Sequence, residues 1–60
     1  MPYKFEIFKD KKDEFRFRMV APNGQIIANS EGYTRKENCL DTIESIRRNA
    51  ADAEIIEVEE

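Results

Sequence analysis

Apolar and charged residues alternate with a period of two in two segments near the start of the chain. The apolar positions are Tyr3, Phe5 and Ile7 in the first segment and Phe15, Phe17 and Met19 in the second. Side chains of a strand point alternately to the two faces of a sheet. The pattern therefore predicts two antiparallel strands with one aromatic face and one charged face, joined by a polar turn over 10–13. Phe8 breaks the alternation and belongs to the opposite face or to a bulge.

A second turn follows at Pro22-Asn23-Gly24, where proline presets the backbone and the next two residues tolerate positive φ. Ile26, Ile27 and Ala28 then predict a short third strand. The three strands together present an aromatic face that another element has to cover.

An amphipathic helix is predicted to provide that cover. Thr34 followed by Glu37 fits a capping box, so we expect the helix to begin there. Its apolar residues recur at helical spacing and are Cys39, Leu40, Ile43, Ile46 and Ala50. Basic residues in the last turn suit the helix dipole, and Asn49 is expected to end the helix in a left-handed conformation.

The segment Glu54–Val58 predicts a fourth strand, with the apolar residues Ile55, Ile56 and Val58. The predicted order is β-β-β-α-β, a three-stranded antiparallel meander, one helix and a C-terminal strand. This is an α+β fold in a single domain covering residues 1–60.

The small size of the chain predicts that it assembles with itself. Sixty residues bury only a marginal core, and domains of this size usually need a disulfide, a metal or a partner. Cys39 is the only cysteine and there is no histidine, so an intrachain disulfide is impossible and a structural zinc site is not expected. Homo-oligomerisation is the stabilising device that remains.

Composition and charge narrow the functional classes. The chain lacks the run of about 18 apolar residues that crosses a membrane and the apolar stretch of a secretory signal, so a cytoplasmic location is expected. The net charge of −3 is unevenly spread, at +2 over residues 1–18 and −5 over residues 50–60. The basic front and the acidic tail could attract each other, within one chain or between two, or could be two solvated surfaces.

The junction Ser30-Glu31-Gly32-Tyr33, between the third strand and the helix, has two interpretations. Ser30 could be a nucleophile, or the start of the helix an anion site. A nucleophilic serine needs a base such as histidine, and a single glycine is not a phosphate-binding loop. The favoured interpretation is structural, in which Gly32 permits an unusual φ and Tyr33 anchors the corner. We expect no catalytic residue, no metal site and no cofactor.

Two further features carry a functional and a structural alternative. Cys39 lies on the apolar side of the helix, which favours a core residue over a reactive thiol. Lys4, Arg16 and Arg18 should lie on the charged sheet face, where they could bind nucleic acid. Acidic residues interleave with them and the net charge is negative, which argues against a polyanion.

Several segments, taken together, resemble the YegP-like family of small bacterial and archaeal proteins of unknown function. They are Phe5-Glu6-Ile7-Phe8-Lys9-Asp10, Phe15-Arg16-Phe17-Arg18, Ala21-Pro22-Asn23-Gly24-Gln25-Ile26-Ile27-Ala28, Ser30-Glu31-Gly32-Tyr33, and Ile43-Glu44-Ser45-Ile46 followed by Asn49-Ala50. Members carry one such unit or two in tandem, and this chain has one. Two positions depart from the family pattern: Asp13 lies where glycine is common in the first turn, and Phe17 where tryptophan is common.

The resemblance implies a homodimer in which two units form one sheet and exchange their C-terminal strands. Ile55, Ile56 and Val58 would then be buried by strand addition. It brings no established catalytic residues. We therefore expect a non-enzymatic homodimeric accessory or interaction protein, with a further protein partner not identified. The alternative is a nucleic-acid-associated module that uses the charged sheet face.

Overall fold

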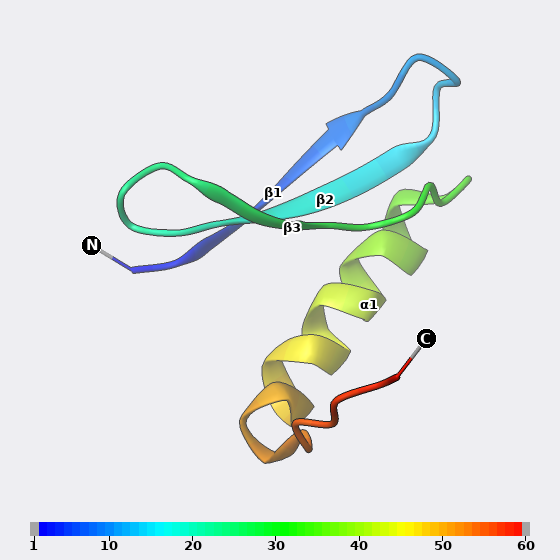
Figure 1. Cartoon of the computed structure of the whole chain (residues 1–60). Helices are drawn as coiled ribbons and strands as arrows, with labels where there is room; N and C mark the ends of the chain where they lie inside the picture. The colour runs from blue at the N-terminus through cyan, green and yellow to red at the C-terminus, as the bar shows by residue number, and fades with distance from the viewer. Residues whose placement is uncertain (1, 60) are drawn as a thin grey trace.

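The computed structural model describes residues 2–59, which form a three-stranded antiparallel sheet with one helix beneath it (Figure 1). The elements are β1 (Lys4–Lys9), β2 (Phe15–Val20), β3 (Ile26–Asn29), α1 (Lys36–Asn49) and a short 3-10 helix, η1 (Ala50–Asp52). The sheet order is β1-β2-β3, a meander. The predicted α+β class, with three strands followed by a helix, is confirmed.

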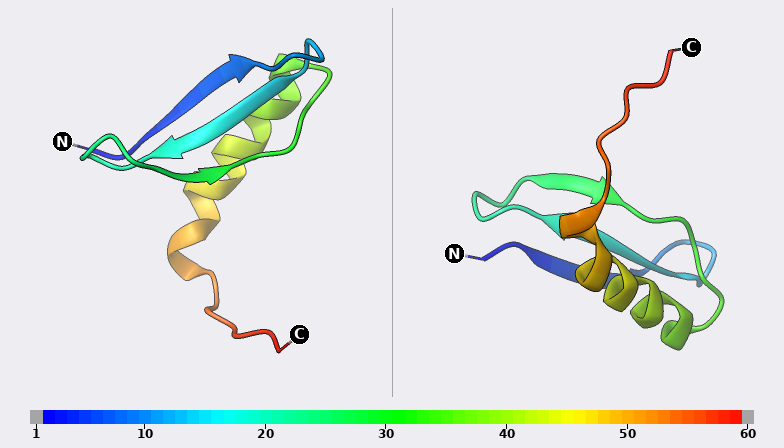
Figure 2. Two further views of the ribbon diagram at one scale, coloured as in Figure 1. Left: turned by 45° about the horizontal axis from the view of Figure 1, so that its top comes forward. Right: turned by 90° about the horizontal axis from the view of Figure 1, so that it is seen from below.

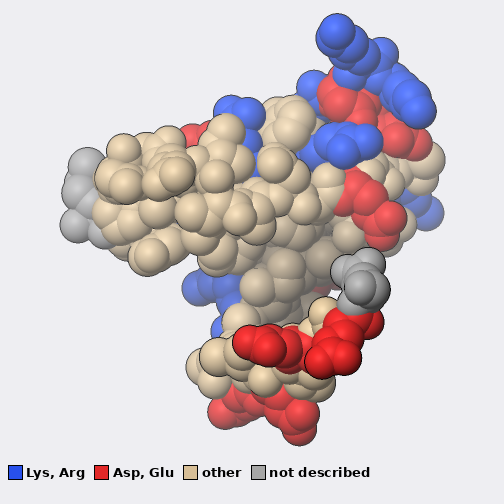
Figure 3. Space-filling model, in the orientation of Figure 1, with Lys and Arg blue, Asp and Glu red and all other residues tan. Residues whose placement is uncertain are grey.

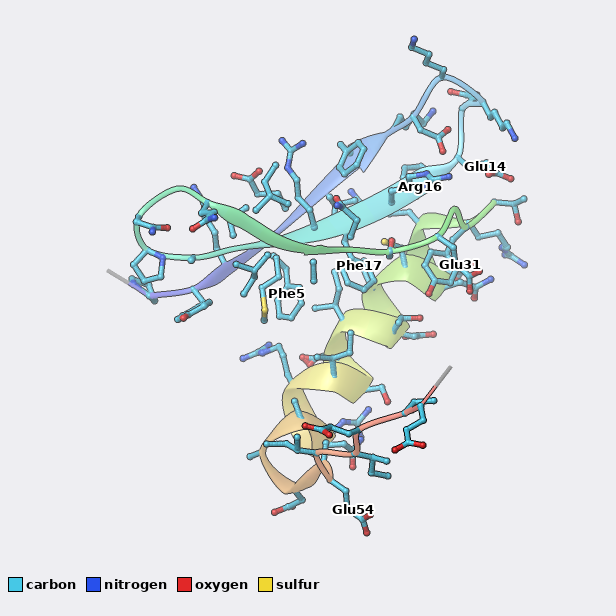
Figure 4. The ribbon with its side chains drawn as sticks, in the orientation of Figure 1. Phe5, Glu14, Arg16, Phe17, Glu31 and Glu54 are labelled. Atoms are coloured by element: carbon cyan, nitrogen blue, oxygen red, sulfur yellow. The ribbon has the colours of Figure 1, made fainter. Side chains whose placement is uncertain are left out.

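The core lies between one face of the sheet and α1 (Figure 2). Its buried residues are Phe17, Cys39 and Ile43, and the half-buried residues packed on them are Phe5, Ile7, Phe15, Tyr33 and Ile46. The rings of Phe5 and Phe17 meet edge to face with centroids 5.7 Å apart, an arrangement that aromatic quadrupoles favour. Figure 4 shows both rings on the side of the sheet that faces α1. The predicted aromatic face is thus the covered face.

The first hairpin closes through a three-residue loop. The Asp10 amide donates to the Glu14 carbonyl at 2.9 Å, and the Asp13 amide donates to the Asp10 carbonyl at 3.0 Å. Asp13 has a φ of +64°, which places it in the left-handed region. A turn followed by one left-handed residue is a common three-residue hairpin connection.

The second hairpin uses the same plan. The Gly24 amide donates to the Ala21 carbonyl at 2.8 Å, and the Ala21 amide donates to the Gln25 carbonyl at 2.8 Å. The left-handed position is here filled by Gly24, with a φ of +88°. The predicted turn at Pro22-Asn23-Gly24 is confirmed, and Asp13 and Gly24 hold equivalent places in the two loops.

The start of β1 differs from the sequence pattern, and Phe8 near its end takes one of its two predicted places. Tyr3 lies before β1 and is 58% exposed, although the alternation placed it on the aromatic face. Phe8 follows the strand alternation and lies on the face opposite Phe5 and Ile7, next to Arg18. No bulge interrupts the pairing of β1 with β2.

The predicted caps of the helix were each wrong by one residue. The N-cap is Arg35, with extended φ and ψ and no side-chain capping bond, so Thr34 caps nothing. Oε1 of Glu37 lies 2.5 Å from Nη2 of Arg35, so the Glu37 side chain pairs with Arg35 instead of bonding to the backbone of the predicted cap. Asn49 has a φ of −116°, and its side-chain amide donates to the Ser45 carbonyl at 2.8 Å. The chain therefore continues into η1 rather than ending in a left-handed residue.

The C-terminal segment, residues 53–59, forms no strand within the described chain. The predicted strand at Glu54–Val58 thus finds no partner in its own sheet. Its apolar side chains stand in solvent, with exposed fractions of 100% for Ile55, 69% for Ile56 and 75% for Val58. An isolated strand has no ladder of hydrogen bonds to hold it, so the segment needs another surface to become one.

Candidate interaction surfaces

The sheet face opposite α1 carries paired charges. Glu6 and Arg18 are direct cross-strand neighbours in the β1–β2 register. The Arg18 Nε donates to Glu6 Oε1 at 2.8 Å, and Lys4 Nζ lies 3.3 Å from Glu6 Oε2. The hydrogen bonds from Arg18 and then Lys4 hold the pKa of Glu6 below its ordinary value. Two of the predicted binding cations thus share one carboxylate.

Arg16 is held at the first hairpin loop. Its Nε donates to Asp10 Oδ2 at 2.5 Å, and its Nη1 donates to the Ser30 carbonyl at 3.2 Å. The other oxygen of Asp10 accepts from the amides of Lys12 and Glu14, at 2.9 and 3.0 Å. The bond from Arg16, followed by the one from the Glu14 amide, lowers the pKa of the Asp10 carboxyl.

Phe8 is the aromatic residue of this open face. The Arg18 guanidinium lies over its ring, 4.8 Å from the centroid. Lys4, Arg16 and Arg18 therefore lie on one face, as predicted, but each contacts a carboxylate and Phe8 lies under an arginine. A charge-compensated face with a covered ring suits nucleic acid poorly, since such binding needs uncompensated cations and accessible aromatics.

The Ser30–Tyr33 junction extends the pairing of β2 beyond β3. The Ser30 amide donates to the Phe17 carbonyl at 2.9 Å, and the Ser30 hydroxyl accepts from the Phe17 amide at 2.9 Å. Tyr33 then exchanges both backbone bonds with Phe15, at 2.7 and 2.8 Å. The serine hydroxyl replaces a backbone carbonyl in the ladder, so the structural interpretation of this corner is the one that the geometry supports.

Gly32 completes the corner by leaving room for a neighbouring side chain. A Cβ built at Gly32 would collide with the carboxylate of Glu14. The role predicted for Gly32, an unusual φ, is not what the structure shows, because Gly24 is the glycine with positive φ. The glycine therefore leaves space that the Glu14 side chain occupies.

Cys39 is a core residue, as predicted. Its side chain is fully buried in the cluster with Phe17 and Ile43, and burial raises the pKa of its thiol. Among residues 2–59, no three potential ligands of the His, Cys, Asp and Glu types gather closely enough for a metal ion. The part of the chain that the structure describes also has no helix of the length and apolarity that crossing a bilayer requires.

Charge is unevenly distributed over the molecule. In Figure 3 basic side chains gather at the end of the sheet that carries the first hairpin loop, with acidic side chains among them, and acidic side chains gather at the C-terminal end of the chain. Glu54, Glu57 and Glu59 are exposed there, beside the apolar residues of the same segment. The C-terminal segment thus combines exposed apolar side chains with a strong negative charge.

A shallow hollow of about 200 Å³ lies by the second loop. It is lined by Pro2, Lys4, Ala21, Pro22 and Gly24. Among these described lining residues the ammonium of Lys4 is the one titratable group, and it is paired with Glu6. The hollow therefore offers no acid–base pair.

Sequence reasoning missed the roles of Asp10 and Ser30. The sequence pattern assigns Asp10 only to a polar turn, whereas in the structure Asp10 accepts three hydrogen bonds that hold the loop and Arg16. An aspartate at the first position of a tight turn is a known signal for side-chain bonds to the amides that follow, and it was available in the sequence. The ladder bond of Ser30 depends on register, which no local pattern displays.

Comparison with known proteins places the chain among proteins of unknown function. The family model "Domain of unknown function (DUF1508)" matches residues 10–57. A UPF0339 protein of Treponema denticola is 55% identical over 58 residues, covering 97% of this chain and all of that protein. A UPF0339 protein of Methanosarcina acetivorans is 48% identical, covering 93% of this chain and 97% of that protein.

Two solved structures share the fold. The solution structure of a Haloferax volcanii protein has a TM-score of 0.84 at 46% identity, with 93% of this chain and 95% of that one covered. The solution structure of ATU0232 from Agrobacterium tumefaciens has a TM-score of 0.82 at 48% identity, with 93% and 90% covered. The sheet and helix described above are therefore shared with proteins of bacteria and archaea.

Proposed function

This chain belongs to the DUF1508 family, whose function is unknown, and we propose that it is a non-enzymatic homodimeric interaction protein. In this dimer the C-terminal segment of each copy adds a strand to the sheet of the other. The family membership agrees with the resemblance to YegP-like proteins found in the sequence.

The observation that carries the proposal is the exposure of Ile55, Ile56 and Val58. Each has more than two thirds of its surface in solvent at the end of a chain that has few buried residues. Fully burying a side chain of this kind contributes about 1.5–3 kcal/mol. A sixty-residue domain has little stability to lose. Three neighbouring apolar side chains in solvent are therefore better explained by another surface that covers them.

The sheet offers the matching surface. Its order is β1-β2-β3, so both outer strands present unpaired backbone N–H and C=O groups along one side. An extended segment that pairs with such an edge gains backbone hydrogen bonds and packs alternate side chains on the sheet faces. Supplying the segment from a second copy satisfies both needs in a closed, two-fold arrangement.

The state of the candidate reactive groups among the described residues supports a role in interaction rather than catalysis. Cys39 is buried, the Ser30 hydroxyl is part of the β2 ladder, and the carboxylates of Glu6 and Asp10 are bonded to arginines on an open face. None of these groups is free to act as nucleophile or base. The compensated charges of the open face also favour this proposal over the nucleic-acid alternative.

Light scattering over a dilution series tests the assembly. We expect the parent protein to be a dimer, and Ile56→Asp to weaken the dimer at least about tenfold, because a carboxylate would replace a buried side chain. Ala53→Asp adds the same charge before the predicted strand and is the matched control, with the parent's dimer affinity expected.

Two results would contradict the proposal. One is a parent protein that stays monomeric and folded at every concentration. The other is an Ile56→Asp protein that dimerises as tightly as the parent. Deletion of residues 54–60 gives an independent check, since we expect the shortened chain to lose its fold, and a folded shortened monomer would oppose the exchange.

A further inference from the structure

We propose that the C-terminal segment of one copy pairs antiparallel with the outer edge of β1 of the second copy, in the register that sets Glu54 opposite Lys9 and Glu59 opposite Lys4. The inference rests on the proposed function and adds to it the edge, the direction and the register. Four comparisons within the described chain carry it.

The first comparison is between the two free edges. β3 has only four residues, Ile26–Asn29, and its pairing with β2 is shifted by an irregularity opposite Met19 and Val20. Short strands and bulges are the features that protect a sheet edge from further pairing. β1 has six residues and an unbroken register over its whole length. β1 is the longer and more regular of the two edges, and it is the one able to accept a six-residue strand.

The second comparison is between the charges at the ends of the strands. β1 begins with Lys4 and ends with Lys9, both exposed, whereas Ile26–Asn29 has no charged residue. The segment of residues 54–59 begins and ends with Glu54 and Glu59. The two lysines and the two glutamates have the same spacing of five residues. An antiparallel arrangement therefore sets each glutamate directly opposite a lysine.

The third comparison concerns the residues between these ends. The same register sets Ile56 opposite Ile7 and Val58 opposite Phe5, on the side of the sheet that packs against α1. The residue between them, Glu57, falls on the open face. Apolar pairs thus extend the core of the sheet by one strand.

The cross-strand pairs that this register forms on the open face are also compatible. Ile55 lies opposite Phe8, which is half-buried, and so covers the free side of that ring. Glu57 lies opposite Glu6, the one like-charged pair. The charge of Glu6 is already compensated by Arg18, opposite it on β2, and by Lys4, two residues earlier on β1. The register therefore places no acidic residue of the segment next to an uncompensated one.

The fourth comparison is with the parallel direction. Keeping Ile56 and Val58 on the α1 side, a parallel segment sets Ile56 opposite Phe5 and Val58 opposite Ile7. Ile55 would then face Lys4, and Glu59 would face Phe8. Both charge pairs and the apolar pair on the open face are lost. The antiparallel direction is the one that the side chains favour.

The second copy is needed because the segment of the same chain points elsewhere. α1 descends from the sheet, and residues 53–59 leave its far end, away from β1 (Figure 1 and the left view of Figure 2). Glu54 lies at this far end (Figure 4). Lys9 is the proposed neighbour of Glu54. Its Nζ lies 3.3 Å from Oδ1 of Asp13 at the loop, and the ammonium has further N–H donors for a second carboxylate.

Disulfide trapping tests the edge and the register. The variant Lys9→Cys with Glu54→Cys is oxidised in the whole chain and run on a non-reducing gel, with the linked peptides identified by mass spectrometry. Directly opposite residues come close enough for a disulfide, so we expect most of the protein to run as a covalent dimer with residue 9 of one copy joined to residue 54 of the other. Cys39 stays in place because it is buried, and the parent chain serves as the control for it.

Three other pairs are trapped in the same way. Tyr3→Cys with Glu54→Cys reports a parallel segment, and Asn29→Cys or Ile26→Cys with Glu54→Cys reports pairing at β3. Efficient linkage in any of these pairs, a 9–54 bond within one chain, or no linkage in the 9–54 variant overturns the inference. Light scattering of each reduced variant separates this failure from failure of the proposed function, because a dimer without the 9–54 bond refutes only the register.

Discussion

The two hairpin loops give a comparison between single residues within one molecule. Asp13 and Gly24 occupy the same left-handed position in loops with the same backbone bonds. A side chain at positive φ is crowded by the neighbouring carbonyl, and aspartate tolerates that position better than most residues. Its salt bridge to Lys9 is exposed and adds little stability.

Asp13→Gly is therefore expected to stabilise the protein, by about 0.5–1 kcal/mol. Chemical denaturation followed by circular dichroism measures the change. Gly24→Asp is the reciprocal variant and should destabilise by a similar amount. A stability loss in Asp13→Gly would show that the bonds of the aspartate outweigh its backbone strain.

Asp10 joins the first loop to the open face of the sheet through its bonds to Arg16 and to two amides. Its pKa is lowered in the folded protein from an ordinary value of 3.8. A carboxyl of this kind contributes stability that is present above its unfolded pKa. That stability is lost as the pH falls through the folded pKa.

We expect the free energy of unfolding to fall as the pH is lowered below about 4, and Asp10→Asn to show a smaller fall over the same range. The measurement is urea denaturation from pH 7 to pH 2. Asp41→Asn removes the same charge from α1 and is the control. If Asp10→Asn and the parent lose stability in parallel, the bonds to Asp10 do not contribute to acid sensitivity.

At the scale of elements, the start of α1 differs from its local sequence signal. The N-cap is Arg35, which forms no capping bond and places a cation where the helix dipole favours an anion. The predicted capping box at Thr34 does not form: the backbone ladder to Phe15 extends to Tyr33, and Arg35 is still extended, so the helix begins after it. Tertiary pairing here overrides a local signal.

Arg35→Ser is expected to stabilise the protein by about 0.5–2 kcal/mol, since serine can accept a bond from a free amide of the first turn. Thermal unfolding measures the gain, and Arg35→Ala is the control that removes the cation without adding a cap. Equal stability of the serine and alanine variants would mean that the hydroxyl does not cap α1.

Elements with a strong pattern were predicted well. The period of two in β1 and β2, the Pro-Asn-Gly turn and the helical spacing around Cys39 each depend on residues near one another in the chain. The exposed Tyr3 and the loop bonds of Asp10 were not predicted, because burial and hydrogen bonding at those places depend on the whole sheet. The common face of Lys4, Arg16 and Arg18 followed from alternation, but their carboxylate partners required the register of the strands.

At the scale of the whole molecule, the main difference between the sequence-based prediction and the structure lies in the C-terminal segment. Three β-branched residues predict a strand over 54–58, and a strand exists only against another strand. The structure of one copy leaves that segment exposed and acidic, and leaves the edge of β1 free and flanked by lysines. Strand exchange would give the C-terminal segment and the β1 edge the partner that each of them lacks.

Because Cys39 is buried, the reactivity of its thiol reports how often α1 separates from the sheet. A thiol-specific reagent reaches the sulfur only when α1 separates from the sheet, because the side chain is fully enclosed and is the only thiol of the chain. The rate of labelling under native conditions therefore counts opening events. Its dependence on protein concentration would show whether the helix opens within an intact assembly or only after two copies separate.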